Sequence, residues 1–303
     1  MTRSTLAKPK ADLATHAALF VVQVAFASQS VEAKVAMMPR ASGGEAIPPV
    51  AIAMARMLAG ALFFQVFVNT VAKPKEPREA LTPRDHAKLF VLSLLGITAN
   101  QAIFLLGLGK TTPFAAALLS ATIPVCTSLL AALFGVERLR ARTVMGFSLA
   151  VAGVLVLTGV RTVDRGALLI AVNSLLYSGY LVAGKSTISR LGALRVVTWA
   201  FTWGALSFLP IGLVPLVHAV PELTARGWGL VIYILLMPTI VAYALNAWAL
   251  GRSNPTLVTV YIYLQPLIAA ALSYVQLGIV PTGTMGASSV LILAGVAVVA
   301  LRR

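Results

Sequence analysis

The sequence predicts an all-α integral membrane protein, with ten transmembrane helices arranged as two inverted five-helix repeats around a central cavity. The composition, the length of the apolar runs and a weak internal repeat lead to this prediction. Of the 303 residues, 59% are hydrophobic and 11% are charged, against about a quarter charged in a soluble domain. Mean hydropathy is +0.90. Such a chain needs lipid as its solvent, which excludes a soluble enzyme, a disordered chain and a collagen-like chain.

Ten apolar runs are long enough to cross a bilayer, which takes about 20 residues of helix. Within lipid each run must satisfy its own backbone hydrogen bonds, so we expect helices. A β-barrel is disfavoured because its strands are about half as long and alternate apolar with polar residues. The first run, with Glu32 and Lys34, and the seventh, with Pro210 and Pro215, are the weakest. The expected spans are 13–36, 48–71, 87–109, 113–134, 143–160, 166–184, 196–217, 228–249, 255–277 and 283–301.

The first run has a second interpretation as a signal peptide. Lys8 and Lys10 precede it, and Ala25-Phe26-Ala27 resembles a signal-peptidase site. The apolar character continues past that site, however. We therefore expect the run to be retained as the first transmembrane helix.

The distribution of basic residues predicts the orientation in the membrane. With the N-terminus inside, 17 Lys and Arg residues fall on the inner side and 6 on the outer side, as the positive-inside rule requires. Both termini are then cytoplasmic. The net charge of +15 is explained by this topology, because basic residues on the inner side contact anionic lipid headgroups. Nucleic acid is not an expected partner, because the basic residues form short clusters between apolar runs rather than one basic face.

A weak internal repeat links the two halves of the chain at a spacing of 142 residues. It pairs Gly109 with Gly251, Lys110 with Arg252, Pro113 with Pro255, Pro124 with Pro266 and Gly153 with Gly295. Each half contains five helices, an odd number, so the second copy must enter the membrane from the opposite face. We divide the chain into a cytoplasmic tail (1–12), a first repeat (13–160) and a second, inverted repeat (166–301). Inverted repeats are typical of secondary transporters that bind substrate between the halves.

The residues needed for catalysis or for a metal site are scattered. There are nine acidic residues, three histidines and one cysteine, Cys126, and they form neither a clustered ligand set nor a pair of carboxylates at membrane depth. No glycine-rich nucleotide loop opens a soluble domain. We therefore expect no enzyme activity, no metal and no cofactor.

Glu32 and Arg56 are the charged residues expected at membrane depth, where charges usually face a bundle interior or a watery cavity. For Glu32 the alternatives are a proton-coupling or substrate-ammonium site, and an outer-mouth residue that is solvated or paired with Arg56. For Arg56 they are a structural tie between helices and recognition of a substrate carboxylate. We favour the structural interpretation of both residues.

Pro124 and Pro266 fall near the middle of the fourth and ninth runs. A proline there removes one backbone hydrogen bond and leaves the carbonyls of Ser120 and Ile262 partly free. Such a kink either lines the cavity and takes part in rocking of the halves, or is a plain packing kink. The repetition at matched positions favours the first interpretation.

Polar and aromatic side chains from runs 1, 3, 4, 6, 8 and 9 are the candidate cavity walls. Each amide has the alternative role of bridging neighbouring helices. Runs 5 and 10 are almost free of polar groups and are expected to face lipid or a partner. The tryptophans near helix ends are expected to anchor at the interface, with Trp203 as the exception. The candidate cavity residues are Ser28, Gln29, Asn100, Gln101, Asn173, Tyr177, Tyr180, Trp203, Tyr243, Asn246, Tyr261 and Gln265.

The stretch 107–160, which begins GLGKTTPF, resembles the end of an EamA domain of the drug/metabolite transporter superfamily, and ALGRSNPT from residue 249 repeats the pattern. Arg56 also occupies a position where the family usually has an arginine. Two departures are the lack of a second-copy counterpart to Glu137, and the missing tryptophan-glycine pair of the first helix. The sequence is most similar to bacterial amino acid exporters, notably those for aromatic amino acids.

This resemblance implies alternating-access export of amino acids, above all aromatic and other apolar ones, and related small metabolites across the bacterial inner membrane. The expected partners are the small-molecule substrate and the bilayer, and the protein is a monomer or a homodimer. The alternatives are efflux of drugs or other metabolites and, outside transport, a membrane receptor or scaffold.

Overall fold

The computed structural model describes residues 12–72, 80–135, 141–158, 164–252, 261–280 and 282–300. Within these ranges every regular element is a helix. The first half contains α1 (Leu13–Met37), the short 3₁₀ helix η1 (Arg40–Ser42), α2 (Pro49–Thr70), α3 (Pro83–Ser93), the π-helix η2 (Leu94–Thr98), α4 (Ala99–Lys110), α5 (Pro113–Ser120), α6 (Ile123–Leu133) and α7 (Ala141–Thr158).

The second half begins with two of the longest helices. Its elements are α8 (Arg165–Leu191), α9 (Ala193–Ala219), the 3₁₀ helix η3 (Val220–Glu222), α10 (Ala225–Leu235), the π-helix η4 (Leu236–Val241), α11 (Ala242–Arg252), α13 (Leu264–Leu277) and α14 (Gly283–Ala300). Pro210 and Pro215 lie inside α9 without ending it.

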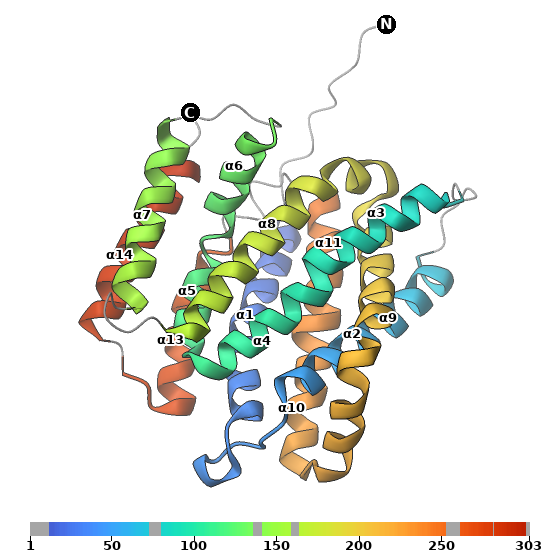
Figure 1. Ribbon diagram of the computed structural model, residues 1–303, viewed down its shortest axis with the longest axis horizontal. Coiled ribbons are helices and arrows are strands. Elements are labelled where there is room, and N and C mark those ends of the chain that lie inside the picture. The colour runs from blue at the N-terminus through green and yellow to red at the C-terminus, as the bar shows by residue number, and fades with distance from the viewer. Residues whose placement is uncertain are drawn as a thin grey trace, which may run out of the picture.

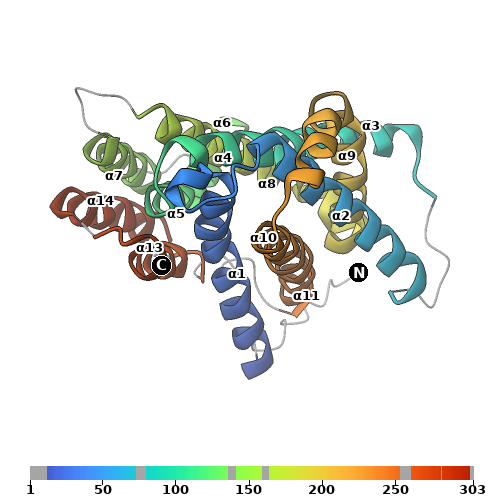
Figure 2. The same ribbon diagram turned by 90° about the horizontal axis from the view of Figure 1, so that it is seen from below.

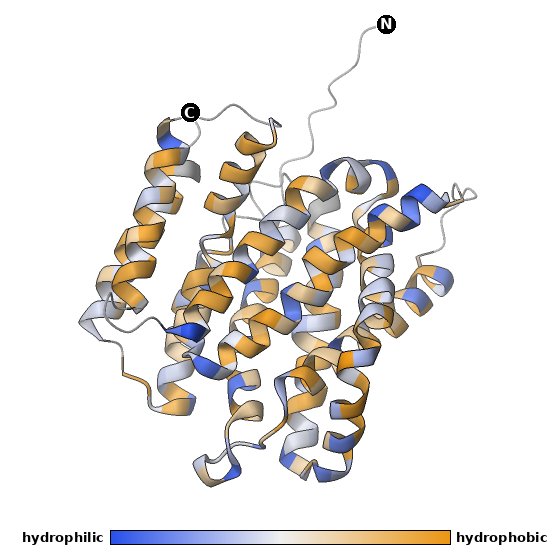
Figure 3. Ribbon diagram, in the orientation of Figure 1, coloured by the Kyte–Doolittle hydropathy of each residue, from blue (hydrophilic) through white to orange (hydrophobic). Residues whose placement is uncertain are grey.

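Among the described residues, seven helical stretches are long and apolar enough to cross a membrane, and three shorter apolar helices accompany them. The seven are Leu13–Met37, Pro49–Thr70, Pro83–Lys110, Pro113–Leu133, Arg165–Leu191, Ala193–Glu222 and Ala225–Ala249; the shorter ones are Ala141–Leu157, Leu264–Leu277 and Gly283–Val298. The fold is therefore an all-helical membrane fold. Apolar residues predominate along most of its helices (Figure 3), and exposed side chains such as Leu62, Ile211 and Val214 fit contact with lipid.

Local sequence signals explain where several helices begin. Asp12 caps α1 by accepting the Thr15 backbone N–H at 2.9 Å and the Thr15 hydroxyl at 2.7 Å. These two bonds hold the pKa of Asp12 below its ordinary value, with a smaller contribution from the charge of Arg252. Thr82 and Asp85 form a capping box at the start of α3, and Asp85 also forms an ion pair with Arg190 of α8.

The helices form a bundle in which α7, α13 and α14 lie on one side, α2 and α9 on the other, and α1 between them (Figures 1 and 2). The most extensive contacts join α7 to α14, α2 to α9 and α4 to α8. A Cβ at Gly295 of α14 would lie 2.5 Å from the Gly146 carbonyl oxygen of α7. The two apolar helices expected to face lipid or a partner thus pack closely on each other.

The helical stretch Pro113–Leu133 is interrupted just before Pro124. Residues 121 and 122 separate α5 from α6, and Pro124 lies in the first turn of α6, where its missing N–H costs no hydrogen bond. Ser174 and Ser178 of α8 donate to the carbonyls of Leu119 and Ile123 at the break, each over 3.1 Å. The break is therefore filled by hydroxyl groups from a neighbouring helix.

The region around Pro266 is similar. Pro266 lies in the first turn of α13, and the Ile262 carbonyl, expected to be partly free, accepts the Gln265 backbone N–H at 3.0 Å. The preceding residues 253–260 lie outside the described part of the chain. Both prolines thus begin a helical segment.

Two π-helices interrupt long helices at matched places. They are η2, from Leu94, and η4, from Leu236, so they start at the repeat spacing of 142 residues. The hydroxyls of Thr98 in η2 and Ser207 in α9 share a hydrogen bond of 3.0 Å. η2 thus contacts the second half of the chain. η4 contacts the first half, through a hydrogen bond between Thr239 and Arg56 of α2. π-helices are frequent at functional sites.

Candidate functional site

Arg56 of α2 is the buried charge of the bundle interior. Its side chain is 2% exposed, and its Nε donates to the Thr239 hydroxyl of η4 at 2.9 Å. Thr239 is itself fully buried and donates its own proton to the Ile234 carbonyl at 2.9 Å. This bond joins the first half of the chain to the second through the π-helix.

Aromatic rings border the arginine. The Tyr243 phenol of α11 lies within electrostatic reach of the Arg56 guanidinium. The Tyr243 ring stands edge-on to Phe201 of α9 and Phe26 of α1, with centroid distances of 5.1 and 5.7 Å. Gly60, one turn after Arg56, lies beneath Phe201. We call Arg56, Thr239, Tyr243, Phe201 and Phe26 the central cluster.

Tyr177 and Tyr180 of α8 continue this aromatic surface. Their rings are 5.7 Å apart, and both interact electrostatically with Tyr243. They pack in one apolar group with Trp203 of α9. Trp203 is also edge-on to His86 at 5.9 Å. The indole Nε1 of Trp203 and Nδ1 of His86 are buried with no hydrogen-bond partner among the described residues.

The carboxylate of Glu32 lies elsewhere. It accepts a hydrogen bond from Gln276 of α13 at 2.8 Å, so it does not pair with Arg56. The other acids with side-chain partners in the described residues are Asp12 with Thr15, Glu45 with Thr224, Asp85 with Arg190, Asp164 with Thr111 and Glu222 with Arg40. No carboxylate of the described residues therefore compensates the charge of Arg56.

The predicted amides of α4 and α8 have different surroundings. The side-chain amide of Asn173 donates to the backbone carbonyl of Asn100 at 2.7 Å, and the side-chain amide of Asn100 donates to the backbone carbonyl of Asn173 at 3.4 Å. This reciprocal pair joins the two helices. Gln101 is 2% exposed, and neither its Oε1 nor its Nε2 has a partner among the described residues. Asn246, on α11, is half-buried.

The predicted residues of α1 and α13 form contacts between helices. Ser28 shares a hydrogen bond of 2.7 Å with the Tyr233 hydroxyl of α10, and Gln29 is buried beside it. Gln265 donates to Gln23 at 2.7 Å. Tyr261 bonds through its hydroxyl to His16 Nδ1 at 2.7 Å. These contacts attach α1 to the second half of the chain.

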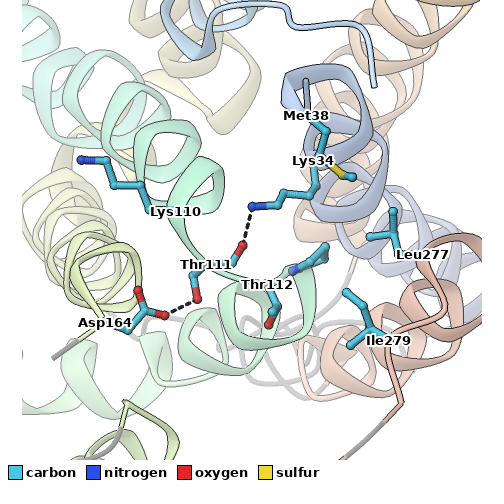
Figure 4. Close-up of a pocket in the computed structure, with 9 residues that line it drawn as sticks. Lys34, Met38, Lys110, Thr111, Thr112, Asp164, Leu277 and Ile279 are labelled. Atoms are coloured by element: carbon cyan, nitrogen blue, oxygen red, sulfur yellow. Dashed lines mark hydrogen bonds between the residues drawn. The ribbon is translucent and has the colours of Figure 1, made fainter. Parts of the chain in front are cut away.

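A pocket of about 480 Å³ lies apart from the central cluster, where the ends of α1, α4, α8 and α13 meet (Figure 4). Lys34 extends from α1 and donates to the carbonyls of Leu108, Gly109 and Thr111 at 3.0, 3.0 and 2.8 Å. The Thr111 hydroxyl donates to Asp164 at 2.6 Å. The pocket is lined by Lys34, Met38, Lys110, Thr111, Thr112, Pro113, Asp164, Leu277 and Ile279.

The described residues contain no group of three His, Cys, Asp or Glu side chains close enough to hold a metal ion. Chemistry in the central cluster is limited to what a guanidinium, hydroxyls and aromatic faces provide. These groups bind anions and apolar rings. Such a cluster suits reversible binding of a small molecule.

Several contacts of the central cluster, and several that attach α1 to the second half, were missed by sequence reasoning. Thr239 and Phe201 looked like ordinary residues of apolar runs, and Tyr233 and Gln23 like isolated polar ones. The repeat spacing of 142 residues contained one usable signal. It relates the segments Leu94–Thr98 and Leu236–Val241, each with a threonine, and both are π-helices in the structure.

Comparison with known proteins points to one family. The model of the EamA-like transporter family matches the chain twice, over residues 16–159 and 164–301. Protein WALLS ARE THIN 1 of Arabidopsis thaliana is 27% identical, covering 88% of this chain and 82% of the plant protein. A probable terminal-alkyne amino-acid exporter of Streptantibioticus cattleyicolor is 26% identical, covering 69% of this chain and 73% of the exporter.

A crystal structure of a protein without a functional description has the same fold. It superposes with a TM-score of 0.57 at 22% sequence identity, covering 92% of this chain and 96% of that chain.

Proposed function

This chain belongs to the EamA-like transporter family of the drug/metabolite transporter superfamily, and we propose that it is a secondary transporter that exports amino acids and related small metabolites by alternating access. The preferred substrates in this proposal have aromatic or other apolar side chains. The transporter lies in the bacterial inner membrane with both termini in the cytoplasm, as a monomer or a homodimer.

The central cluster is the observation that carries this proposal. It combines side chains from α1 and α2 in the first half with side chains from α9, η4 and α11 in the second. A secondary transporter binds its substrate between its halves near the middle of the membrane. A guanidinium beside aromatic rings suits an anionic group attached to an apolar side chain.

Relations between the halves support a pair of repeats with equivalent contacts, and we propose that the repeats are inverted and comprise ten transmembrane helices. α1 packs against α11 and α13, and α8 packs against α4 and α6. The counterparts are α1 and α8, α4 and α11, and α6 and α13. Each of these two contacts of α1 therefore has an equivalent contact of α8. The matched π-helices are counterparts in the same way. The proposed repeats are 13–160 and 166–301, after a cytoplasmic tail of residues 1–12.

The amino acid part of the proposal is supported by one relative, the probable terminal-alkyne amino-acid exporter, and by the aromatic character of the central cluster. The proposed walls of the cavity include Tyr177, Tyr180 and Tyr243 with Gln101 and Trp203. The remaining predicted residues would connect the moving halves. Those with a bond to another segment are Ser28, Asn100, Asn173, Tyr261 and Gln265. We propose the same role for Gln29 and Asn246 and for the helix interruptions at Pro124 and Pro266.

Flux through the purified protein in liposomes tests the function. Vesicles loaded with labelled phenylalanine or leucine should release it in a saturable manner that unlabelled amino acid inhibits, and protein-free vesicles should not. A panel of cationic dyes serves as the comparison. Dye flux without amino acid flux would establish drug efflux instead, and no flux of either class would favour a receptor or scaffold.

The same vesicles decide how transport is driven. An imposed pH gradient should leave the rate unchanged if transport is facilitated diffusion. If the gradient accelerates efflux, the Glu32→Gln variant tests whether the Glu32 carboxylate couples transport to protons or only bonds to a neighbouring helix. Because Glu32 bonds to the neutral amide of Gln276, we expect the variant to keep the wild-type response. Loss of the response would make Glu32 a coupling group.

A further inference from the structure

Arg56 carries a positive charge, and none of the carboxylates in the described part of the chain pairs with it. The side chain is 2% exposed, and the described carboxylates that have partners bond to other residues, as listed above. Glu76, Glu79 and Glu137, which lie outside the described residues, belong to segments expected between the apolar runs. A buried ion without a counter-ion costs several kcal/mol, and charges within membranes are usually functional.

The hydrogen bonding of Arg56 is also incomplete. A guanidinium has five N–H donors in a planar fork, and the structure gives one bond, from Nε to Thr239. That bond orients the plane of the group. The two Nη groups find no acceptor among the described residues, so the fork is set for a planar bidentate acceptor, which a carboxylate supplies.

The surroundings indicate what is attached to that carboxylate. The half-buried rings of Tyr243 and Phe26 meet edge to face at 5.7 Å, and the fully buried ring of Phe201 supports Tyr243 from behind at 5.1 Å. Gly60 leaves room for the Phe201 ring one turn from Arg56. An apolar or aromatic side chain would therefore meet aromatic faces close to the guanidinium. A phosphate or dicarboxylate would bring a second charge against those rings without a partner.

We propose that Arg56 is the counter-ion of a substrate carboxylate, and that the half-buried rings of Tyr243 and Phe26 receive the apolar side chain of the same molecule. This inference rests on the proposed function and narrows its substrates to monocarboxylates such as aromatic amino acids. Thr239 is then a positioning residue that holds the guanidinium plane.

The test compares phenylalanine with phenylalaninamide and phenethylamine, which keep the ring and lack the charged carboxylate. Wild-type protein in liposomes should prefer phenylalanine over both by about 10- to 100-fold in KM, the range that a lost charge-assisted contact produces. Arg56→Gln should reduce this preference to less than about threefold. Arg56→Lys, which keeps the charge without the fork, should retain part of it.

Thr202→Val is the matched control. It removes a bond of α2 outside the central cluster, from Gln65 to the Thr202 hydroxyl at 2.9 Å, and leaves nearly the same volume, so it should keep the wild-type preference. If Arg56 serves only to tie α2 to η4, Thr239→Val and Arg56→Gln should lower the melting temperature alike and leave the preference intact. That outcome overturns the inference.

Two further results complete the test. If Arg56→Gln does not fold, binding of the three compounds to wild-type and Arg56→Lys protein decides, and equal affinities overturn the inference. Saturable phenylalanine flux with an unchanged preference in Arg56→Gln defeats this inference and leaves the proposed function standing. Absence of any amino acid flux in the wild type defeats the proposed function itself.

Discussion

Gly60 determines how closely α2 and α9 approach beside the central cluster. A Cβ at this position would lie 2.3 Å from the Phe201 ring. The ring cannot easily move, because it is fully buried and is held by Phe64 on one side and Tyr243 on the other. A glycine, whose side chain is a hydrogen atom, therefore fits at position 60, whereas a methyl group would overlap the ring.

We expect Gly60→Ala to destabilise the protein by about 1–3 kcal/mol through overpacking and to lower substrate flux. Thermal unfolding in detergent measures the first effect. Gly229→Ala in α10 is the control, because a Cβ there meets nothing within 4 Å, and it should be neutral or slightly stabilising. Equal melting temperatures for the two variants would contradict the packing argument.

Lys34 supports a second prediction at this scale. Its three bonds to carbonyls at the end of α4 satisfy groups that a helix end leaves unpaired. Lys34→Met should cost about 2 kcal/mol of stability, the scale of hydrogen bonds to charged groups. Lys110→Met changes the same pocket at an exposed lysine and should cost little. A similar loss in both variants would mean that charge in the pocket, not the carbonyl bonds, matters.

At the scale of the element, the break between α5 and α6 is held by Ser174 and Ser178, both fully buried on α8. Cys126, buried in α6 just after the break, is the only cysteine of the chain and reports on opening there. Replacing both serines by alanine should cost about 1 kcal/mol, at about 0.6 kcal/mol for each interhelical bond.

The double variant should also increase the rate at which a maleimide labels Cys126. Ser186→Ala, at an exposed position of the same helix, is the control and should leave the labelling rate at the wild-type value. Unchanged labelling in the double variant would show that the serines do not hold the break.

The limits of sequence reasoning are clearest for these elements. Hydropathy predicted an all-helical membrane fold because lipid leaves the backbone few alternatives. The chemistry of proline predicted a kink near Pro124, but it did not predict the serines that bond there, because they are 50 or more residues away in sequence. The π-helices have no composition signal, because they depend on contacts such as that between Arg56 and Thr239.

The candidate site shows the same limit. Tyr177, Tyr180 and Tyr243 attracted attention as polar aromatics in apolar runs, and the structure brings them together. Phe201 did not stand out, because a phenylalanine in a transmembrane helix is ordinary until Gly60 and Tyr243 are found beside it. Pairwise partners depend on packing that one sequence does not contain.

At the scale of the whole molecule, the proposed topology places the link between α1 and α2 outside the cell and the link between α8 and α9 inside. In a Cys126→Ala background, a cysteine at exposed Ser42 should react with an impermeant maleimide on intact cells. A cysteine at exposed Ser189 should react only after permeabilisation. The opposite pattern would reverse the orientation, and labelling of both in intact cells would contradict the span assignment.

The π-helix η4 also bears on how such proteins diverge. A π-turn contains one residue more than the α-turn it replaces, so deleting a single codon between Leu236 and Val241 would restore a uniform helix. Because either turn completes one rotation, later residues such as Tyr243 would keep their side of the helix. The same deletion in a uniform α-helix would instead rotate every later residue by about 100°. A π-turn can therefore absorb an indel of one residue, which percentage identity scarcely registers, without changing the side chains that face the interior.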